Sequence, residues 1–157
     1  MNWFNDYRKM AKDEREYYKE YIYDNEQRIV AMDYDRLIES LKYIATKPEV
    51  LNKQTNRHLK LAEEVALSFD NESFHLAHNF YEMKLIDTEC MQEFEKINDL
   101  FEKIDEDVKN DWSLDYMIRD EKWIAIRNIA NDILSKIEMS DNDRAITPEC
   151  DLKKYRH

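Results

Sequence analysis

Four side chains that can ligate a metal ion lie close together in the stretch ESFHLAHNFYE. Glu72 and His75 form a Glu-x-x-His pair, and His78 and Glu82 continue it at helical spacing. Imidazole and carboxylate groups suit zinc or iron. A di-iron bundle, however, needs a second Glu-x-x-His motif and two more glutamates on facing helices, and the sequence has only this pair. His75 and His78 can equally lie at the boundary of the core. We predict no metal or cofactor, and a helical metalloprotein remains an alternative.

A second group of side chains consists only of carboxylates. Between Asp87 and Asp111 the chain has ten acidic and three basic residues. Four of the acids recur at spacings typical of one helix face, opposite an apolar face, and we call them the acidic stripe: Glu95, Asp99, Glu102 and Glu106. Like charges at i,i+4 cost about 0.2–0.5 kcal/mol each. A basic partner would offset this cost, which makes the stripe the predicted partner-binding site; an ordinary solvated face is the alternative.

The charge of the whole chain points in the same direction. It has 35 acidic and 24 basic residues and a formal net charge of −11. Phosphate backbones repel such a surface, so direct binding to nucleic acid is not expected. A strongly acidic protein is instead suited to association with a basic protein. Solubility alone is the other interpretation of this charge.

Several catalytic classes are excluded by residue types that the chain lacks. Glycine is absent, which rules out phosphate-binding glycine loops, dinucleotide fingerprints and nucleophile elbows. Cys90 lies in the first turn of a predicted helix, but the neighbouring Glu89 and Glu93 oppose formation of a thiolate. We therefore predict that the protein is not an enzyme. Cys90 and Cys150 form no CxxC pair, and this usage indicates a reduced, cytoplasmic chain. No segment approaches the length of apolar sequence that spans a membrane.

A chain without glycine favours helices over sheets, with turns built from Asn, Asp and Ser. We predict an all-α, single-domain antiparallel bundle of about six or seven helices over residues 1–138. The polar segment 139–157 is expected to be a tail, partly disordered or loosely docked. The FDNES stretch is expected to be a turn, Asp87 or Thr88 to cap one helix, and Ser113 or Asp111 another. The expected helices are 2–31, one that starts near Asp33 or Asp35 and ends at Pro48, then 48–69, 73–86, 88–110, 114–119 and 121–138.

Tyrosines are concentrated in the first part of the chain. Seven of the ten lie between Tyr7 and Tyr43, and several recur at helical spacing. A tyrosine ring that keeps its hydroxyl in water suits a half-buried packing face, and equally a protein interface. Tyr17 and Tyr21 are therefore predicted to contact a partner, and a homo-oligomer formed through this segment is a further possibility.

The segment from Asp111 to Leu134 contains two of the three tryptophans. The spacing from Trp123 to Ile137 predicts the apolar face of an amphipathic helix, with Trp112 at a corner before it. Arg127 lies one turn after Trp123, where it can stack on the indole or reach acids of the 88–110 helix.

This segment also resembles a known class of proteins. The pattern W-S-L followed by D-E-K-W-I-A-I-R-N-I-A-N-D-I-L is similar to the C-terminal helical pair of small acidic immunity proteins. Such proteins are encoded beside bacterial toxins of the polymorphic, contact-dependent or LXG kind. The resemblance implies a non-enzymatic inhibitor that binds and occludes a toxin, such as a basic nuclease, and it implies no catalytic residue. A phage-encoded anti-CRISPR protein or another nucleic-acid mimic is the alternative. The residues that carry the resemblance are Trp112, Leu114, Trp123, Arg127, Ala130 and Leu134.

Overall fold

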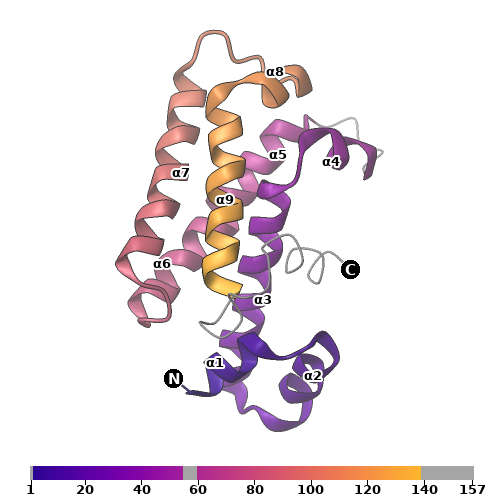
Figure 1. Ribbon diagram of the computed structural model, residues 1–157, viewed down its shortest axis with the longest axis vertical. Coiled ribbons are helices and arrows are strands. Elements are labelled where there is room, and N and C mark those ends of the chain that lie inside the picture. The colour runs from indigo at the N-terminus through magenta and orange to yellow at the C-terminus, as the bar shows by residue number, and fades with distance from the viewer. Residues whose placement is uncertain (1, 55–59, 139–157) are drawn as a thin grey trace.

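Long antiparallel helices form the body of the protein. The computed structural model describes residues 2–54 and 60–138, and these ranges contain helices and no β-strand. Helices α3 (Asn25–Ala45), α7 (Thr88–Glu106) and α9 (Glu121–Glu138) run along the long axis of the molecule. Helix α9 packs against both of the others and runs in the opposite direction (Figure 1). The predicted all-α bundle is therefore confirmed.

Shorter helices complete the fold around this body. Figure 1 shows α1 and α2 at the lower end of the molecule and α4 and α8 near the upper end, while the segment from α5 to α6 passes behind α9. Two segments, η1 and η2, are π-helices, whose turns are wider than those of an α-helix. The bounds are α1 Asn2–Lys9, α2 Lys12–Tyr17, η1 Tyr18–Ile22, α4 Pro48–Gln54, α5 Leu61–Ser68, η2 Phe69–Ser73, α6 Phe74–Glu82 and α8 Leu114–Arg119.

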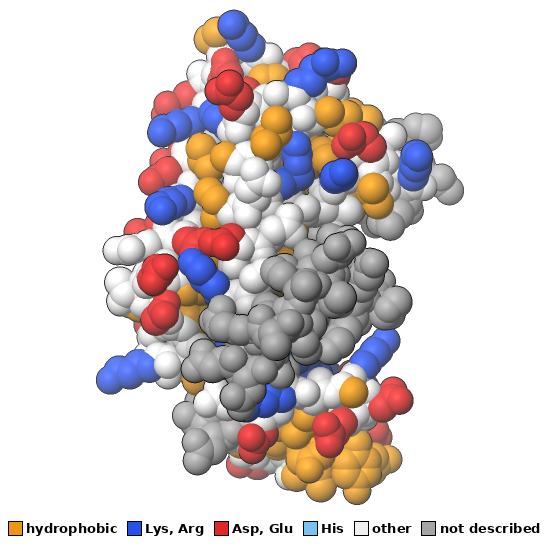
Figure 2. Space-filling view, viewed as in Figure 1, with side chains coloured by type: hydrophobic (Ala, Val, Ile, Leu, Met, Phe, Trp, Pro, Cys, Tyr) orange, Lys and Arg blue, Asp and Glu red, His pale blue; other side chains and the backbone are white. Residues whose placement is uncertain are grey.

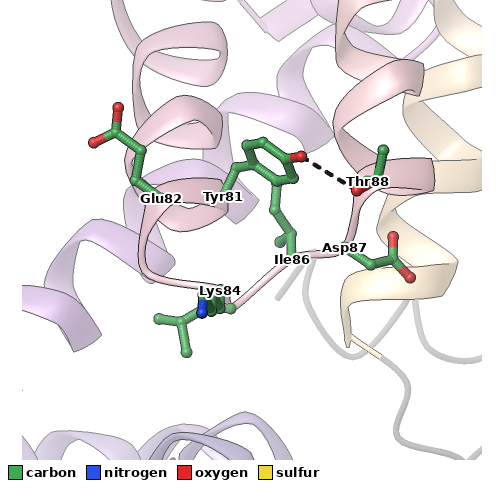
Figure 3. Close-up of a pocket in the computed structure, with 7 residues that line it drawn as sticks. Tyr81, Glu82, Lys84, Ile86, Asp87 and Thr88 are labelled. Atoms are coloured by element: carbon green, nitrogen blue, oxygen red, sulfur yellow. Dashed lines mark hydrogen bonds between the residues drawn. The ribbon is translucent and has the colours of Figure 1, made fainter.

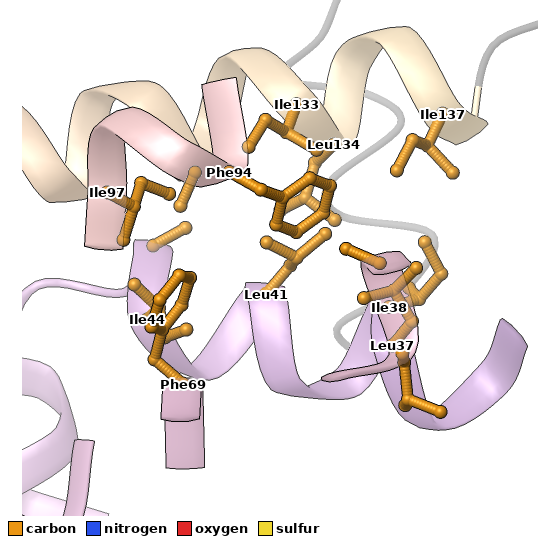
Figure 4. Packing of buried hydrophobic residues seen from close by; sticks show 14 of the residues in the cluster. Leu37, Ile38, Leu41, Ile44, Phe69, Phe94, Ile97, Ile133, Leu134 and Ile137 are labelled. Carbon is orange, nitrogen blue, oxygen red and sulfur yellow. The ribbon is translucent and has the colours of Figure 1, made fainter. Parts of the chain in front are cut away.

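One cluster of buried apolar side chains joins these helices. Each long helix contributes one face with residues at three- and four-residue spacing, which brings its apolar side chains to the same side. Full burial of a Val, Leu, Ile, Phe or Met side chain stabilises a fold by about 1.5–3 kcal/mol. Figure 4 shows the centre of the cluster, where Leu41 of α3 points toward Phe94 of α7, beside Ile133 and Leu134 of α9.

The three tryptophans occupy different parts of the fold. Trp3 on α1 packs edge-on against the ring of Tyr23, with centroids 5.0 Å apart. Trp112 lies in the turn between α7 and α8, and Trp123 on α9 is only 1% exposed. Trp123 packs edge-on against Phe101, with centroids 5.3 Å apart. The predicted core position of Trp123 and corner position of Trp112 are both confirmed.

Side-chain caps begin four of the described helices, and at the start of α9 the Asp120 carboxylate accepts hydrogen bonds from the N–H groups of Lys122 (2.9 Å) and Trp123 (3.4 Å). The Asp87 carboxylate accepts a hydrogen bond from the Cys90 N–H (2.8 Å), and the Ser113 hydroxyl accepts one from the Tyr116 N–H (3.0 Å). Both of these caps were among those predicted. Asp24 forms a reciprocal capping box with Gln27 at the start of α3. This last cap was not predicted.

The predicted single helix over 2–31 is wrong. The chain leaves helical geometry after Lys9 and again after Ile22, and α3 begins at Asn25. Asp33 and Asp35, the predicted caps of the second helix, therefore lie inside α3. The physical reason is tertiary. Folding α1 and α2 back onto α3 lets Tyr7 and Lys19 bond to Asp35, which a straight helix would not permit.

The FDNES stretch is not a turn. It forms η2 and joins α5 to α6 as one continuous helical segment. The fully buried Ser73 hydroxyl bonds to that of Ser40 on α3, and the Ser40 hydroxyl also lies 3.2 Å from that of Ser68. The wide turn aims these polar groups inward together with the buried ring of Phe69. The predicted helix over 48–69 is likewise divided, with α4 ending at Gln54 and α5 beginning at Leu61.

Turns without glycine depend on short polar side chains, as predicted. The Asn110 side chain accepts a hydrogen bond from the Trp112 N–H (2.9 Å), and Asp111 accepts one from the Ser113 N–H (2.9 Å). Two residues with larger side chains nevertheless adopt the left-handed region that usually favours glycine: Lys84 at φ 62° and Trp112 at φ 57°.

The predicted tail over 139–157 lies outside the described residues. In the part of the chain that the structure describes, no helix combines the length and apolar character needed to cross a bilayer.

Candidate protein-binding surfaces

The acidic stripe lies on the outer face of α7. Phe94, Ile97 and Ile104 are fully buried on the opposite face and hold the helix against the body. All four stripe carboxylates are exposed, and none forms an ion pair with a described residue. Figure 2 shows acidic and basic side chains alternating along the edge of the molecule where α7 lies. The predicted exposed face is therefore confirmed, and its role in binding stays a prediction.

Other acids of α7 are bound within the protein. Glu93 is 7% exposed and accepts a hydrogen bond from Lys136 of α9, which also lies 3.4 Å from both Glu89 and Asp132. Burial raises the pKa of Glu93, and the hydrogen bond to Glu93 raises the pKa of Lys136. Helix α7 thus carries two kinds of carboxylate. Those facing α9 are paired with Lys136, whereas the four of the stripe face solvent without a cation among the described residues, and Glu102 accepts a hydrogen bond from Asn98 at 3.4 Å.

Tyr17 and Tyr21 form part of a second exposed surface. Tyr17 is 55%, Tyr21 67% and Ile22 54% exposed, and the two tyrosine rings lie 5.3 Å apart between centroids. We call these three residues the tyrosine surface. Figure 2 shows apolar side chains gathered at the lower end of the molecule, where α2 and η1 lie, with carboxylates beside them. Both tyrosines are thus accessible to a partner, and their role in binding stays a prediction, whereas neighbouring Tyr7 and Tyr23 are buried.

A polar cluster around Asp35 of α3 positions the tyrosine surface. The Tyr7 hydroxyl donates to the carboxylate at 2.7 Å, Lys19 Nζ donates at 2.6 Å, and an Arg15 guanidinium nitrogen lies 3.8 Å away. The Arg15 guanidinium also lies over the rings of Tyr7 (5.0 Å) and Tyr34 (5.6 Å). We call Asp35 and these three partners, Tyr7, Arg15 and Lys19, the Asp35 cluster. It ties α1, α2 and η1 to the body of the protein.

Protonation in the Asp35 cluster follows from its geometry. Burial and the hydrogen bond to Asp35 raise the pKa of Tyr7, so its hydroxyl keeps its proton and acts as a donor. Burial opposes the charge of Lys19, but hydrogen bonds to Asp35 and Glu16 outweigh it and raise the pKa of Lys19. The cluster is therefore a cation-rich group around one carboxylate at neutral pH.

The structure does not bring the two predicted groups of partner-binding residues together. The acidic stripe follows α7 along one side, while the tyrosine surface lies at the lower end of the molecule on α2 and η1 (Figure 1). They are two separate surfaces.

The metal-ligand candidates do not form a site. His75, His78 and Glu82 are exposed, Glu72 lies 3.9 Å from Arg36, and His78 packs edge-on against Phe74. Across residues 2–54 and 60–138, no three His, Cys, Asp or Glu side chains are placed to hold a metal ion. The physical reason is local, because Glu72 belongs to the wide turn of η2 and departs from the α-helical register assumed for the motif.

A surface pocket lies in the turn between α6 and α7. It has a volume of about 730 Å³ and opens to solvent (Figure 3). The Tyr81 ring stands over it with its hydroxyl 3.2 Å from that of Thr88. Nearby Cys90 is buried, and this burial, with added repulsion from Asp87 and Glu93, raises the pKa of its thiol to about 12, which disfavours the thiolate. The side chains that line the pocket are Tyr81, Glu82, Lys84, Leu85, Ile86, Asp87 and Thr88.

Arg127 has neither of its predicted roles. Its guanidinium donates to the carbonyl oxygens of Met117 (2.8 Å) and Ile118 (3.4 Å) in the last turn of α8. It therefore caps the C-terminal end of that helix. Burial lowers the pKa of Arg127, as expected for a cation that has moved away from water.

Comparisons with known proteins gave no relative from which a function can be transferred. No family model, no curated protein and no solved structure matches the chain.

Proposed function

We propose that the protein is a non-enzymatic acidic inhibitor that binds a basic partner protein, and that it is an immunity protein that occludes a bacterial toxin. The observation that carries the proposal is the acidic stripe. Four carboxylates with no cationic partner among the described residues lie along one helix of a rigid bundle.

Helix geometry makes the stripe suitable for this role. At about 1.5 Å per residue the stripe is about 16 Å long, which matches a patch of several Lys or Arg side chains on a partner. The buried face of α7 fixes the backbone, so little ordering is required on binding. The net charge of −11 attracts a basic protein over longer distances and raises its rate of association. Inhibition would follow when the bound helix covers the site at which the toxin binds its own substrate.

The proposal is tested with two variants of equal charge. The stripe variant carries E95Q, D99N, E102Q and E106Q. The control variant carries E63Q, D70N, E82Q and E121Q, which are exposed acids outside the stripe and without an ion pair among the described residues. Each variant removes four negative charges from the net −11, so any difference between them reports the position of the charges.

The partner is first captured from the source organism with the wild-type chain, and the purified pair is then studied by calorimetry at low and high ionic strength. We expect a basic partner with an enzymatic activity that an equimolar amount of the chain abolishes. The stripe variant should bind more weakly and with a smaller salt dependence than the control variant. A captured RNA-guided nuclease would instead support the anti-CRISPR alternative. Equal affinity of the two variants would refute the proposed surface.

A further inference from the structure

The tyrosine surface is a second feature whose exposure the fold does not explain. Elsewhere between Lys12 and Val30 the fold buries the apolar and aromatic side chains more fully, apart from Ile29. Tyr23, one residue after η1, is only 8% exposed. Three large side chains that remain more than half exposed at one corner are typical of an interface.

The charges around this surface restrict what can cover it. The two cations nearest to Tyr17 in sequence, Arg15 and Lys19, point inward to Asp35. Arg28 likewise donates to the backbone carbonyl of Lys19. The acids of the same segment point outward, and the exposed ones are Asp13, Glu14, Glu16, Glu20, Asp24 and Glu26. Glu16 is paired with Lys19 at 3.0 Å, and Lys12 is also exposed, so exposed carboxylates outnumber exposed cations in the segment that carries the tyrosine surface.

Electrostatics then exclude most classes of partner. These carboxylates would repel nucleic acid and anionic membranes. A second copy of the chain would bring two such groups of carboxylates together, each on a protein of net charge −11. A cationic protein segment is attracted by the same groups.

Among cationic side chains, arginine fits this surface best. A guanidinium can stack flat on a tyrosine ring while its N–H groups bond to neighbouring carboxylates, and the ammonium of lysine has no such plane. The protein already contains an example of this arrangement. Arg15 lies over the Tyr7 and Tyr34 rings with a nitrogen 3.8 Å from the Asp35 carboxylate.

We propose that the tyrosine surface is a docking site for an arginine-containing basic segment of a protein partner. This docking site is separate from the acidic stripe. A negative result at the docking site would therefore not refute the proposed function, and a negative result at the stripe would not refute the docking site. Tyr17 and Tyr21 contact the guanidinium groups, and the surrounding carboxylates supply the charge.

The test uses fluorescein-labelled hexa-arginine and hexa-lysine and measures their fluorescence anisotropy with the full chain. The main variant is Y17A/Y21A. Y17F/Y21F keeps the rings, and Y81A removes an exposed tyrosine on α6 as a matched control. The stripe variant shows whether the peptide binds α7 instead. Circular dichroism verifies that each variant is folded, which is expected because Tyr17 and Tyr21 are 55% and 67% exposed.

We expect hexa-arginine to bind more tightly than hexa-lysine, and Y17A/Y21A to weaken hexa-arginine binding by about tenfold. Y17F/Y21F and Y81A should bind nearly as the wild type does, and the stripe variant should keep the preference for hexa-arginine over hexa-lysine. Equal binding of the two peptides, or unchanged affinity of Y17A/Y21A, would overturn the proposal. The proposal would also be overturned if light scattering showed a wild-type dimer and a monomeric Y17A/Y21A variant. In that case a second copy of the chain would cover the tyrosine surface.

Discussion

Removal of the Asp35 carboxylate should destabilise the protein far more than removal of a neighbouring acid. In Asp35→Ala the buried Tyr7 hydroxyl loses its acceptor and Lys19 loses its closest anion, 2.6 Å away. Breaking a buried ion pair from one side costs about 3–5 kcal/mol. The Asp35 side chain is 29% exposed, so water can partly replace it. We therefore expect a loss at the lower end, about 3 kcal/mol.

The assay is urea unfolding followed by circular dichroism, with Asp33→Ala as the matched control. Asp33 lies two residues away on the same helix, and its partner Arg36 is 55% exposed at a distance of 3.5 Å. Such a surface pair contributes about 0–1 kcal/mol. Asp35→Asn keeps an acceptor for Tyr7 and should fall between the other two variants. If Asp35→Ala lost no more stability than Asp33→Ala, the assigned role of the Asp35 cluster would be wrong.

Three further predictions concern single residues. Lys84→Gly should stabilise the protein by about 0.5–1 kcal/mol in thermal unfolding, because glycine adopts its φ of 62° without strain, whereas Lys84→Ala should not. In the Cys150→Ser variant, Cys90 of the folded protein should resist a thiol reagent at mildly alkaline pH and react only on unfolding. The reason is that burial raises the pKa of the Cys90 thiol to about 12. Rapid labelling of the folded variant would contradict this prediction. Hydrogen bonds from Tyr116, the Lys109 N–H and Lys122 lower the pKa of Asp107 to about 2. The contribution of the Asp107 carboxylate to stability is therefore complete above its unfolded pKa near 3.8 and is lost as the pH falls through 2. Asp107→Asn should therefore unfold at lower urea than wild type at neutral pH and at the same urea at very low pH, and a difference that persists in acid would refute this assignment.

The sequence predicted the C-terminal half of the fold well because its signals are local. The caps at Asp87 and Ser113 and the apolar spacing on α7 and α9 are each set within a few residues. The same periodicity correctly placed the acidic stripe on an exposed face. The helix boundaries of this half therefore agree closely with those expected.

The N-terminal half was predicted less well because contacts between distant residues decide it. The bond from Tyr7 to Asp35 spans 28 residues, and that from Ser40 to Ser73 spans 33. No pattern within one helix indicates either contact. Without knowledge of these contacts, the sequence does not predict the wide turns of η1 and η2. It also does not predict that Tyr7 is buried while Tyr17 is exposed. The four candidate metal ligands of the alternative interpretation do not come together for the same reason, since η2 changes the register of Glu72.

The positions of the tryptophans allow unfolding to be followed region by region. Trp3 reports on the packing of α1 beside Tyr23, Trp112 on the turn between α7 and α8, and Trp123 on the buried contact with Phe101. Variants that retain one indole each would give three separate fluorescence signals within one small chain. Coincident signals would mean that the N-terminal helices and the bundle unfold as one cooperative unit. Separate signals would instead locate the tyrosine surface and the acidic stripe in regions of different local stability, so that one surface could be lost while the other persists.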